Sequence, residues 1–285
     1  MPKRLDYLCC SPLRVYVCCA IVKSASSRGY RPGQRIPGMP PEKVALIGSG
    51  NWGSAIATKM GINAARHADF HETVHMWVLE EYVRQEPSGK WARPARGVKP
   101  PPGKTWEDLG YTALTKVINE KHENVIYLPG ILLPWNVVAC PDIKTVVTGA
   151  TMMVFVIPHK ILELIVPKMR GSFAKGAIGC SLIKGVEFQR DGEFQPILIS
   201  DLLKREMQKG IANGDWEVDM SVLMGANVAN EVAKGDFAEA TVGCTSLETG
   251  AKWRKLFNTR EFAVSAVPDV AGTELYDLLK NADAR

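Results

Sequence analysis

The stretch Lys43–Gly53, with the sequence KVALIGSGNWG, decides the fold. Residues 43–48 form a short apolar run of the kind found in buried strands, and Asn51–Arg66 follows with apolar residues at helical spacing. A strand that passes through a glycine-rich turn into a helix is typical of a βαβ unit. Gly48, Gly50 and Gly53 match the pattern GxGxxG in the structural context that indicates a dinucleotide-binding turn.

Each glycine of this turn has its own physical reason. Gly48 makes the tight turn, Gly50 lets the backbone approach a pyrophosphate, and Gly53 lets the helix pack closely against the strand. The pyrophosphate would lie at the positive N-terminus of the helix. We therefore expect a cofactor to be bound by the whole turn, that is by Gly48, Ser49, Gly50, Asn51, Trp52 and Gly53. The alternative is a tight turn without a ligand.

The rest of the chain alternates short apolar runs with helical segments. Strands are expected at 73–78, 136–139, 151–157, 177–183, 221–224, 238–243 and 261–266. Helices are expected at 114–121, 160–169, 197–208, 247–257 and from about residue 270. This alternation implies parallel βαβ units with helices on both faces of the sheet. The expected fold class is α/β, with a doubly wound, mostly parallel sheet of the Rossmann type.

Charge and proline content separate a body from two peripheral segments. The net charge of the 285 residues is +5, yet residues 1–42 and residues 84–104 each carry a net charge of +5, so the remaining 222 residues carry −5. The two basic segments also hold 11 of the 18 prolines. We expect residues 1–42 to be an unstructured basic extension and residues 84–112 to be a loop insert in a domain that spans 43–270. Because the positive charge is peripheral, no nucleic-acid partner is expected.

Signals for metal sites, membranes and targeting are weak. The 7 cysteines include no CxxC pair, so neither a disulfide framework nor a metal site is expected. No run of 18 apolar residues is present, so we expect no membrane span. The arginine-rich N-terminus, with its apolar run Val15–Val22, shares features with signal and transit peptides. One interpretation is an extension without a targeting signal, and we expect a cytoplasmic protein. The alternative is that the extension targets the protein to an organelle.

Charged residues at the ends of expected elements are candidate ligand contacts. Glu80, followed by Glu81, comes after the second strand, where a carboxylate would bond the ribose hydroxyls of NAD and repel the 2′-phosphate of NADP. A solvated glutamate pair explains the same residues equally well. Lys184 follows an apolar strand, and Lys280 follows a helical apolar stripe. By position alone, both lysines are expected at the surface.

Seven segments, taken in order, resemble the eukaryotic-type NAD-dependent glycerol-3-phosphate dehydrogenases: VALIGSGNWGSAIA, VHMWVLEE, HENVIYLPG, VFVIPHK, SLIKGVE, SVLMGANVANEVA and TELYDLLKN. The resemblance covers Lys43–Val83 and about Ala113–Asn281. It implies NAD as the cofactor and a hydride transfer between NADH and dihydroxyacetone phosphate that gives sn-glycerol 3-phosphate. The motifs SLIKG and LKN argue against a different two-domain dehydrogenase, such as one that acts on sugar acids.

The resemblance assigns roles to three polar side chains. Lys280 matches the family's catalytic lysine, and Asn281 matches its neighbour in the active-site network. A lysine ammonium beside the substrate carbonyl would stabilise the developing negative charge and deliver a proton. Lys184, in SLIKG, matches the substrate-binding lysine.

Three further residues match cofactor contacts. Ala229, in the helix after MGAN, matches a backbone contact to the cofactor. Leu79 and Ile161 occur where the family commonly has aromatic side chains against the cofactor, so both lack a stacking ring.

The C-terminal end departs from the family. After Asn281 the chain reads ADAR and stops, whereas the family continues into an all-helical domain that supplies further catalytic groups and much of the dimer contact. We therefore expect residues 271–285 to be the start of a truncated interdomain helix and activity to be impaired; whether the family's homodimer forms is left open. The alternative is a non-catalytic NAD(H)-binding module.

Overall fold

The computed structural model describes residues 40–282, except for 96, 190–194 and 212–214. Residues 1–39, which make up nearly all of the expected basic extension, lie outside the described residues, as do 283–285. Within the described part, secondary structure runs from Glu42 to Ala282.

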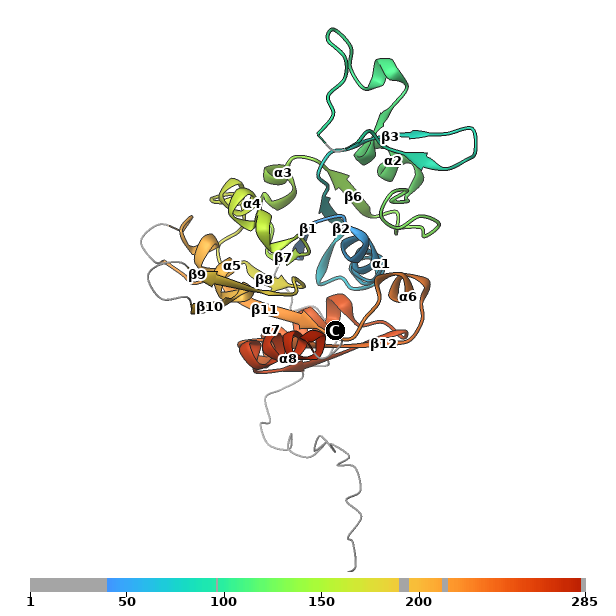
Figure 1. Cartoon of the computed structure of the whole chain (residues 1–285). Helices are drawn as coiled ribbons and strands as arrows, with labels where there is room; N and C mark the ends of the chain where they lie inside the picture. Colours follow the sequence, from blue (N-terminus) through green and yellow to red (C-terminus); the bar gives the residue numbers. More distant parts are fainter. Residues whose placement is uncertain (1–39, 96, 190–194, 212–214, 283–285) are drawn as a thin grey trace, which may run out of the picture. The chain divides into compact units, whose positions relative to one another are not determined.

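One eight-stranded sheet runs through the described body (Figure 1). In chain order its strands are β1 (Glu42–Ile47), β2 (Phe70–Trp77), β6 (Val137–Cys140), β7 (Met152–Phe155), β8 (Ile178–Ser181), β11 (Asp219–Met224), β12 (Ala238–Gly243) and β13 (Phe262–Val267). Their order in space is β13-β12-β11-β8-β7-β1-β2-β6. All neighbours are parallel except β11 and β12. Because β1 lies inside the sheet and the chain winds outward from it in both directions, the expected doubly wound, mostly parallel sheet is confirmed.

Helices cover both faces of the sheet and enclose two apolar cores. The first core contains side chains of α1 (Asn51–Arg66), α2 (Leu114–Lys121), α6 (Ala229–Lys234) and α7 (Leu247–Phe257). The second contains side chains of α3 (Ile143–Val147), α4 (Leu162–Met169) and α5 (Ile199–Gln208). Along β1, Val44 and Leu46 pack in the first core, whereas Ala45 and Ile47 pack in the second. Burial on both faces explains why this strand is a continuous apolar run in the sequence.

The last helix, α8 (Val270–Ala282), packs against β11 and β12 and is joined to α5 by a buried carboxylate. Glu274 is only 1% exposed and accepts hydrogen bonds from the backbone N–H groups of Ile199 (2.8 Å) and Ser200 (3.4 Å). It also accepts a bond of 2.5 Å from the Ser200 hydroxyl. Since these backbone groups open α5 and have no partner within that helix, Glu274 caps α5 from a neighbouring helix.

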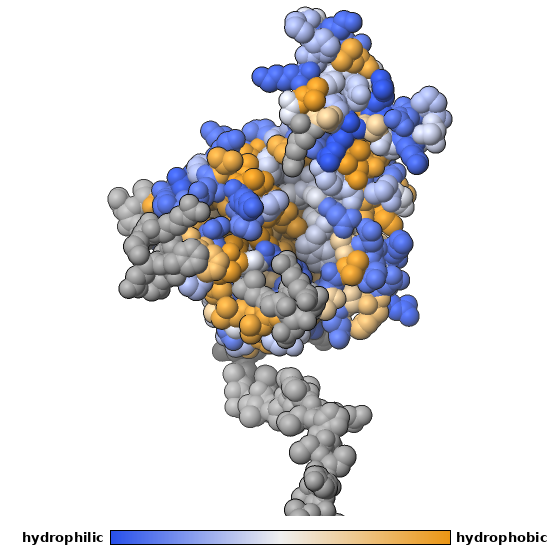
Figure 2. Space-filling view, in the orientation of Figure 1, coloured by the Kyte–Doolittle hydropathy of each residue, from blue (hydrophilic) through white to orange (hydrophobic). Residues whose placement is uncertain are grey.

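The outer face of α8 is apolar and open to solvent. Leu275, Tyr276 and Leu279 are 47%, 73% and 67% exposed. Figure 2 shows hydrophobic surface in the lower part of the molecule, in the region where Figure 1 places α8.

A hairpin of two strands, β9 (Val186–Gln189) and β10 (Gln195–Leu198), was not expected from the sequence. The predicted helix over 197–208 was therefore wrong at its start, because Ile197 and Leu198 belong to β10 and α5 begins at Ile199. Apolar residues continue across this boundary, so periodicity alone does not mark it. The boundary coincides with the cap that Glu274 supplies from α8.

Residues 84–112, expected to be a loop, also carry short secondary structure. β3 (Tyr82–Gln85) pairs antiparallel with β4 (Trp91–Ala92) and β5 (Thr112–Ala113), and a 3-10 turn spans Glu107–Leu109. Pairings of two residues are too short to leave a periodic pattern in the sequence. This insert extends away from the main sheet in Figure 1, and its surface is mainly hydrophilic in Figure 2.

The insert is expected to be dispensable for folding. Val83 and Thr112 are directly paired across β3 and β5, so a two-residue Asn-Gly turn can replace Arg84–Tyr111 without a change of register. The shorter loop favours folding by about 2 kcal/mol of closure entropy. The loss of Trp91, which packs against the first core, offsets a similar amount. We expect the melting temperature to change by no more than about 8 °C in a circular dichroism melt; a larger fall would show that the insert holds the fold together.

Candidate functional site

The turn between β1 and α1 is built by close backbone contacts that only glycine allows. Gly48 has φ +122°, and a Cβ atom on it would lie 2.3 Å from the carbonyl oxygen of Val156. A Cβ atom on Gly53 would lie 2.3 Å from the carbonyl oxygen of Gly48. Around Gly50, by contrast, a Cβ atom would meet nothing within 4 Å. Two glycines are therefore needed for the turn itself, whereas Gly50 faces open space.

The N-terminus of α1 is open to an anion. Gly50 is the N-cap residue, no side chain caps the helix, and its first turn contains no acidic residue. The first N–H groups of a helix have no partner within the helix and carry partial positive charge. Together with the open space at Gly50, they fit the pyrophosphate of a dinucleotide.

A buried asparagine, not predicted from the sequence, holds the turn in place. Asn124 is fully buried, and its Nδ2 donates to the carbonyl oxygen of Ser49 and to the hydroxyl of Ser54, both at 2.8 Å. The Ser54 hydroxyl donates to the same carbonyl at 3.1 Å. Asn124 lies more than 70 residues after the turn, within the segment HENVIYLPG, and nothing in that segment indicates a contact with the turn.

Asn51 connects the turn to two other segments. Its Nδ2 donates to the carbonyl oxygen of Tyr127 (2.8 Å) and to Oδ1 of Asn230 (2.9 Å). Asn230 is the second residue of α6, so the N-terminus of that helix lies beside the turn. The structure thereby brings Ala229, the first residue of α6, to the predicted cofactor turn.

Leu79 and Ile161 lie on either side of β1 at the carboxyl edge of the sheet. Leu79 follows β2 and is 56% exposed, and Ile161 ends a 3-10 turn, His159–Ile161, that follows β7. Ile161 is partly buried against the second core. Because β2 and β7 flank β1, these residues border the point where the strand order reverses, which is where open α/β sheets bind nucleotides.

Glu80 has partners within the protein. One carboxylate oxygen accepts from the backbone N–H of Thr115 (3.2 Å), and the other accepts from the Thr115 hydroxyl (2.6 Å). Thr115 is the second residue of α2, so Glu80 helps to cap that helix. The expectation that Glu80 bonds the cofactor's ribose remains a prediction.

Lys184 joins three elements at the same edge of the sheet. Its Nζ donates to the carbonyl oxygen of Gly225, after β11, at 3.2 Å, and lies 3.3 Å from the carboxylate of Asp277 on α8. Asp277 is almost fully buried. Lys280 and Asn281 follow one helical turn further along α8. Their side chains lie outside what the structure describes.

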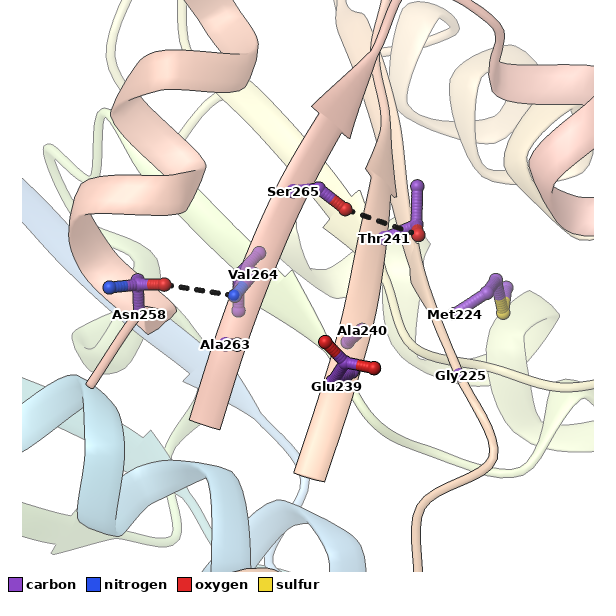
Figure 3. Close-up of a pocket in the computed structure, with 9 residues that line it drawn as sticks. All are labelled: Met224, Gly225, Glu239, Ala240, Thr241, Asn258, Ala263, Val264 and Ser265. Atoms are coloured by element: carbon purple, nitrogen blue, oxygen red, sulfur yellow. Dashed lines mark hydrogen bonds between the residues drawn. The ribbon is translucent and has the colours of Figure 1, made fainter. Parts of the chain in front are cut away.

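A cavity of about 340 Å³ lies next to Gly225 (Figure 3). Its lining comes from β12, β13, the end of β11 and the end of α7: Met224, Gly225, Glu239, Ala240, Thr241, Asn258, Ala263, Val264 and Ser265. Asn258 Oδ1 accepts from the backbone N–H of Val264 at 2.9 Å, as Figure 3 shows. None of the predicted site residues lines this cavity, but Gly225 connects it to Lys184.

No helix in the described part of the chain is both long enough and apolar enough to cross a membrane. Among the same residues, no group of three or more metal-binding side chains is found.

Comparison with known proteins identifies similar chains. Residues 43–250 match the family described as the NAD-dependent glycerol-3-phosphate dehydrogenase N-terminus. The chain is 41% identical over 243 residues to a glycerol-3-phosphate dehydrogenase [NAD(+)] of Cuphea lanceolata, covering 85% of this chain and 55% of the relative. It is 40% identical to the cytoplasmic glycerol-3-phosphate dehydrogenase [NAD(+)] of Mus musculus, covering 85% of this chain and 59% of the relative.

Solved structures agree with this. A glycerol-3-phosphate dehydrogenase of Saccharomyces cerevisiae matches with a TM-score of 0.67 and 32% identity, over 86% of this chain and 61% of that one. One from Plasmodium falciparum matches with a TM-score of 0.66 and 29% identity, over 85% of this chain and 56% of that one. The chain thus spans somewhat more than half the length of the relatives it matches.

Proposed function

Because this chain belongs to the NAD-dependent glycerol-3-phosphate dehydrogenase family, we propose that it binds NAD(H) at Gly48–Gly53 and serves hydride transfer between NADH and dihydroxyacetone phosphate. The product of that transfer is sn-glycerol 3-phosphate. One observation carries the proposal: the N-terminus of α1 has no side-chain cap and faces open space at Gly50. Buried Asn124 holds the turn in this position.

Bound NADH supplies the hydride, and the residues of this chain bind and orient the reactants. The first N–H groups of α1 would hold the pyrophosphate, and Leu79, Ile161 and the backbone of Ala229 would contact other parts of the cofactor. Lys184, already at the carboxyl edge of the sheet, offers an ammonium to an anionic substrate. Lys184 contacts both Gly225 and Asp277 of α8. Its ammonium therefore lies near the helix that carries the proposed catalytic lysine.

Lys280 is the proposed catalytic group, with Asn281 as its neighbour. Its ammonium would stabilise the negative charge that hydride transfer creates on the substrate's carbonyl oxygen, and would deliver a proton to that oxygen. The buried carboxylates of Glu274 and Asp277, earlier in the same helix, hold α8 against α5 and Lys184.

The setting of this activity is proposed from the family and from the sequence. The partner is a small-molecule substrate, and the location is cytoplasmic, as in the name of the mouse relative. Targeting to an organelle by the basic extension is the alternative. The second candidate function is a non-catalytic NAD(H)-binding module, which the same cofactor turn supports. Turnover separates the two functions.

The test is oxidation of NADH by the purified chain with dihydroxyacetone phosphate, followed by absorbance. We expect turnover above that of Lys280→Ala, which should lose about 10²–10³-fold because the carbonyl charge loses its stabilising cation. Tight NADH binding without turnover above that variant would favour the non-catalytic module instead.

Gly50→Ala tests the cofactor turn separately. Its Cβ would meet no protein atom, so we expect the free energy of unfolding to fall by about 1 kcal/mol or less. The methyl group would occupy the space through which the pyrophosphate approaches, so NADH affinity should fall by about tenfold or more, measured by fluorescence titration. Unchanged affinity in a folded Gly50→Ala variant would place the cofactor elsewhere.

A further inference from the structure

An arginine of the insert contacts two side chains of the main body. Arg93 Nη1 donates to both carboxylate oxygens of Glu81, at 2.8 and 3.0 Å, and to the hydroxyl of Tyr127 at 2.7 Å. The Tyr127 hydroxyl in turn donates to Glu81 at 2.8 Å. The guanidinium carbon also lies 5.5 Å from the centre of the Tyr127 ring. Each of these three side chains therefore contacts the other two.

The insert presents Arg93 from an anchored segment. Arg93 directly follows β4, whose two residues pair with Arg84 and Gln85 of β3. Trp91, the first residue of β4, packs against the first core. The ammonium of Lys121, at the end of α2, lies 5.8 Å from the centre of the Trp91 ring. These contacts hold the backbone that carries Arg93 against the body of the protein.

The backbone of Tyr127 belongs to the network that holds the proposed cofactor turn. Its N–H donates to Oδ1 of Asn124 at 3.2 Å, and its carbonyl oxygen accepts from Nδ2 of Asn51 at 2.8 Å. Asn124 also donates to the carbonyl oxygen of Ser49, and Asn51 is the first residue of α1. Tyr127 is thus bonded through its backbone to two residues that position the turn, and through its side chain to the insert.

The burial of Glu81 explains what the arginine contributes. The Glu81 side chain is only 17% exposed, whereas that of Arg93 is 44% exposed. A carboxylate largely withdrawn from water is costly without a paired cation. The Tyr127 hydroxyl is the other partner described for this carboxylate. Without Arg93, Glu81 would therefore turn toward water and shift Tyr127, and the bonds of Tyr127 to Asn51 and Asn124 would loosen.

We propose that Arg93 is a positioning residue for the cofactor: through Tyr127 it holds the turn Gly48–Gly53 in the geometry that binds NADH. The inference rests on the proposed cofactor site and adds a residue that acts on it from outside. It gives the insert, which the family resemblance does not cover, a role in binding that is separate from folding.

The test is a fluorescence titration of the full chain with NADH. Arg93→Gln should raise the Kd for NADH about 3- to 30-fold, because part of the binding free energy is then spent on ordering the turn. Arg93→Lys should bind NADH more tightly than Arg93→Gln. All described bonds of Arg93 come from one nitrogen, Nη1, so an ammonium can replace part of them.

Arg84→Gln is the matched control. It removes the same charge from the same insert, but Arg84 lies over the Tyr111 ring, 4.8 Å from its centre, rather than beside Glu81. We expect its Kd for NADH to stay within about threefold of that of the unchanged chain, and both glutamine variants to melt within about 5 °C of it. A merely structural contact of Arg93 would lower the melting temperature and leave the Kd of the folded chain unchanged.

The double variant of Arg93→Gln and Tyr127→Phe tests the route through Tyr127. Both changes remove the same contact, so we expect the Kd to rise by less than the product of the two single effects. Independent effects, or an Arg93→Gln variant that binds NADH as tightly as Arg84→Gln, would overturn this inference and leave the proposed function standing. If the unchanged chain does not bind NADH at all, the proposed function is wrong, and this inference with it.

Discussion

Gly48→Ala is expected to lower the free energy of unfolding by about 4 kcal/mol. The backbone at Gly48 has φ +122°, a conformation that costs a residue with a Cβ about 1–3 kcal/mol. The new methyl group would also lie 2.3 Å from the carbonyl oxygen of Val156, at the end of β7, and relief of that overlap costs about 1–3 kcal/mol more. Urea denaturation followed by circular dichroism measures the change.

Gly50→Ala is the matched control for this prediction, since it adds the same methyl group two residues away without an overlap. The two variants should separate stability from binding: Gly48→Ala loses stability, and Gly50→Ala loses affinity for NADH. If both were equally stable, the close approach of the turn to β7 would not be a feature of the protein in solution.

Glu274→Ala is the second change with a large expected effect, about 3 kcal/mol lost from the free energy of unfolding. It removes the only acceptor described for the backbone N–H groups of Ile199 and Ser200, and Ser200 also loses the partner of its hydroxyl. Both residues are buried, and each buried polar group left without a partner costs about 1–3 kcal/mol. Because the same carboxylate joins α8 to α5, we also expect faster hydrogen exchange along α8.

The pH dependence of stability tests Glu274 in a second way. Burial raises the pKa of this carboxyl group above its ordinary value of 4.5, although the bonds from Ser200 and Ile199 act in the opposite direction. A raised folded-state pKa means that the stabilising contribution is complete below about pH 4.5 and is lost as the pH rises through the folded-state pKa. We therefore expect the difference in unfolding free energy between the unchanged chain and Glu274→Gln to shrink as the pH rises above 4.5. A difference that grows with pH would show that the hydrogen bonds outweigh burial.

The sequence alone determined the central fold and the cofactor turn, because both depend on local patterns. The helices at 51–66, 114–121 and 247–257 and the strand at 238–243 occur where they were predicted, since each has its own apolar periodicity and its own glycine or polar boundary. Separate roles could be assigned to Gly48, Gly50 and Gly53. A tight turn, the approach of a pyrophosphate to the backbone and close packing of the helix each require a residue without a side chain.

The short elements could not be found in the same way. β9, β10 and α3 contain four or five residues each, which is too few to show a period. Asp142 caps α3 by accepting from the backbone N–H groups of Lys144 and Thr145, so a start signal was present in the sequence but had no periodic segment after it.

Only the tertiary structure decided which distant side chains complete the site. Asn124 reaches the turn from more than 70 residues away, Glu274 caps a helix that begins 75 residues earlier, and Arg93 meets Glu81 and Tyr127 through an insert. Such contacts depend on how the chain folds back on itself, and a hydrogen bond between two polar side chains leaves no periodic trace in either segment. Local sequence therefore specified the strand, turn and helix of the proposed cofactor site. The distant side chains that hold these elements in place, and the Arg93–Glu81 ion pair beside the turn, followed from the way the elements pack.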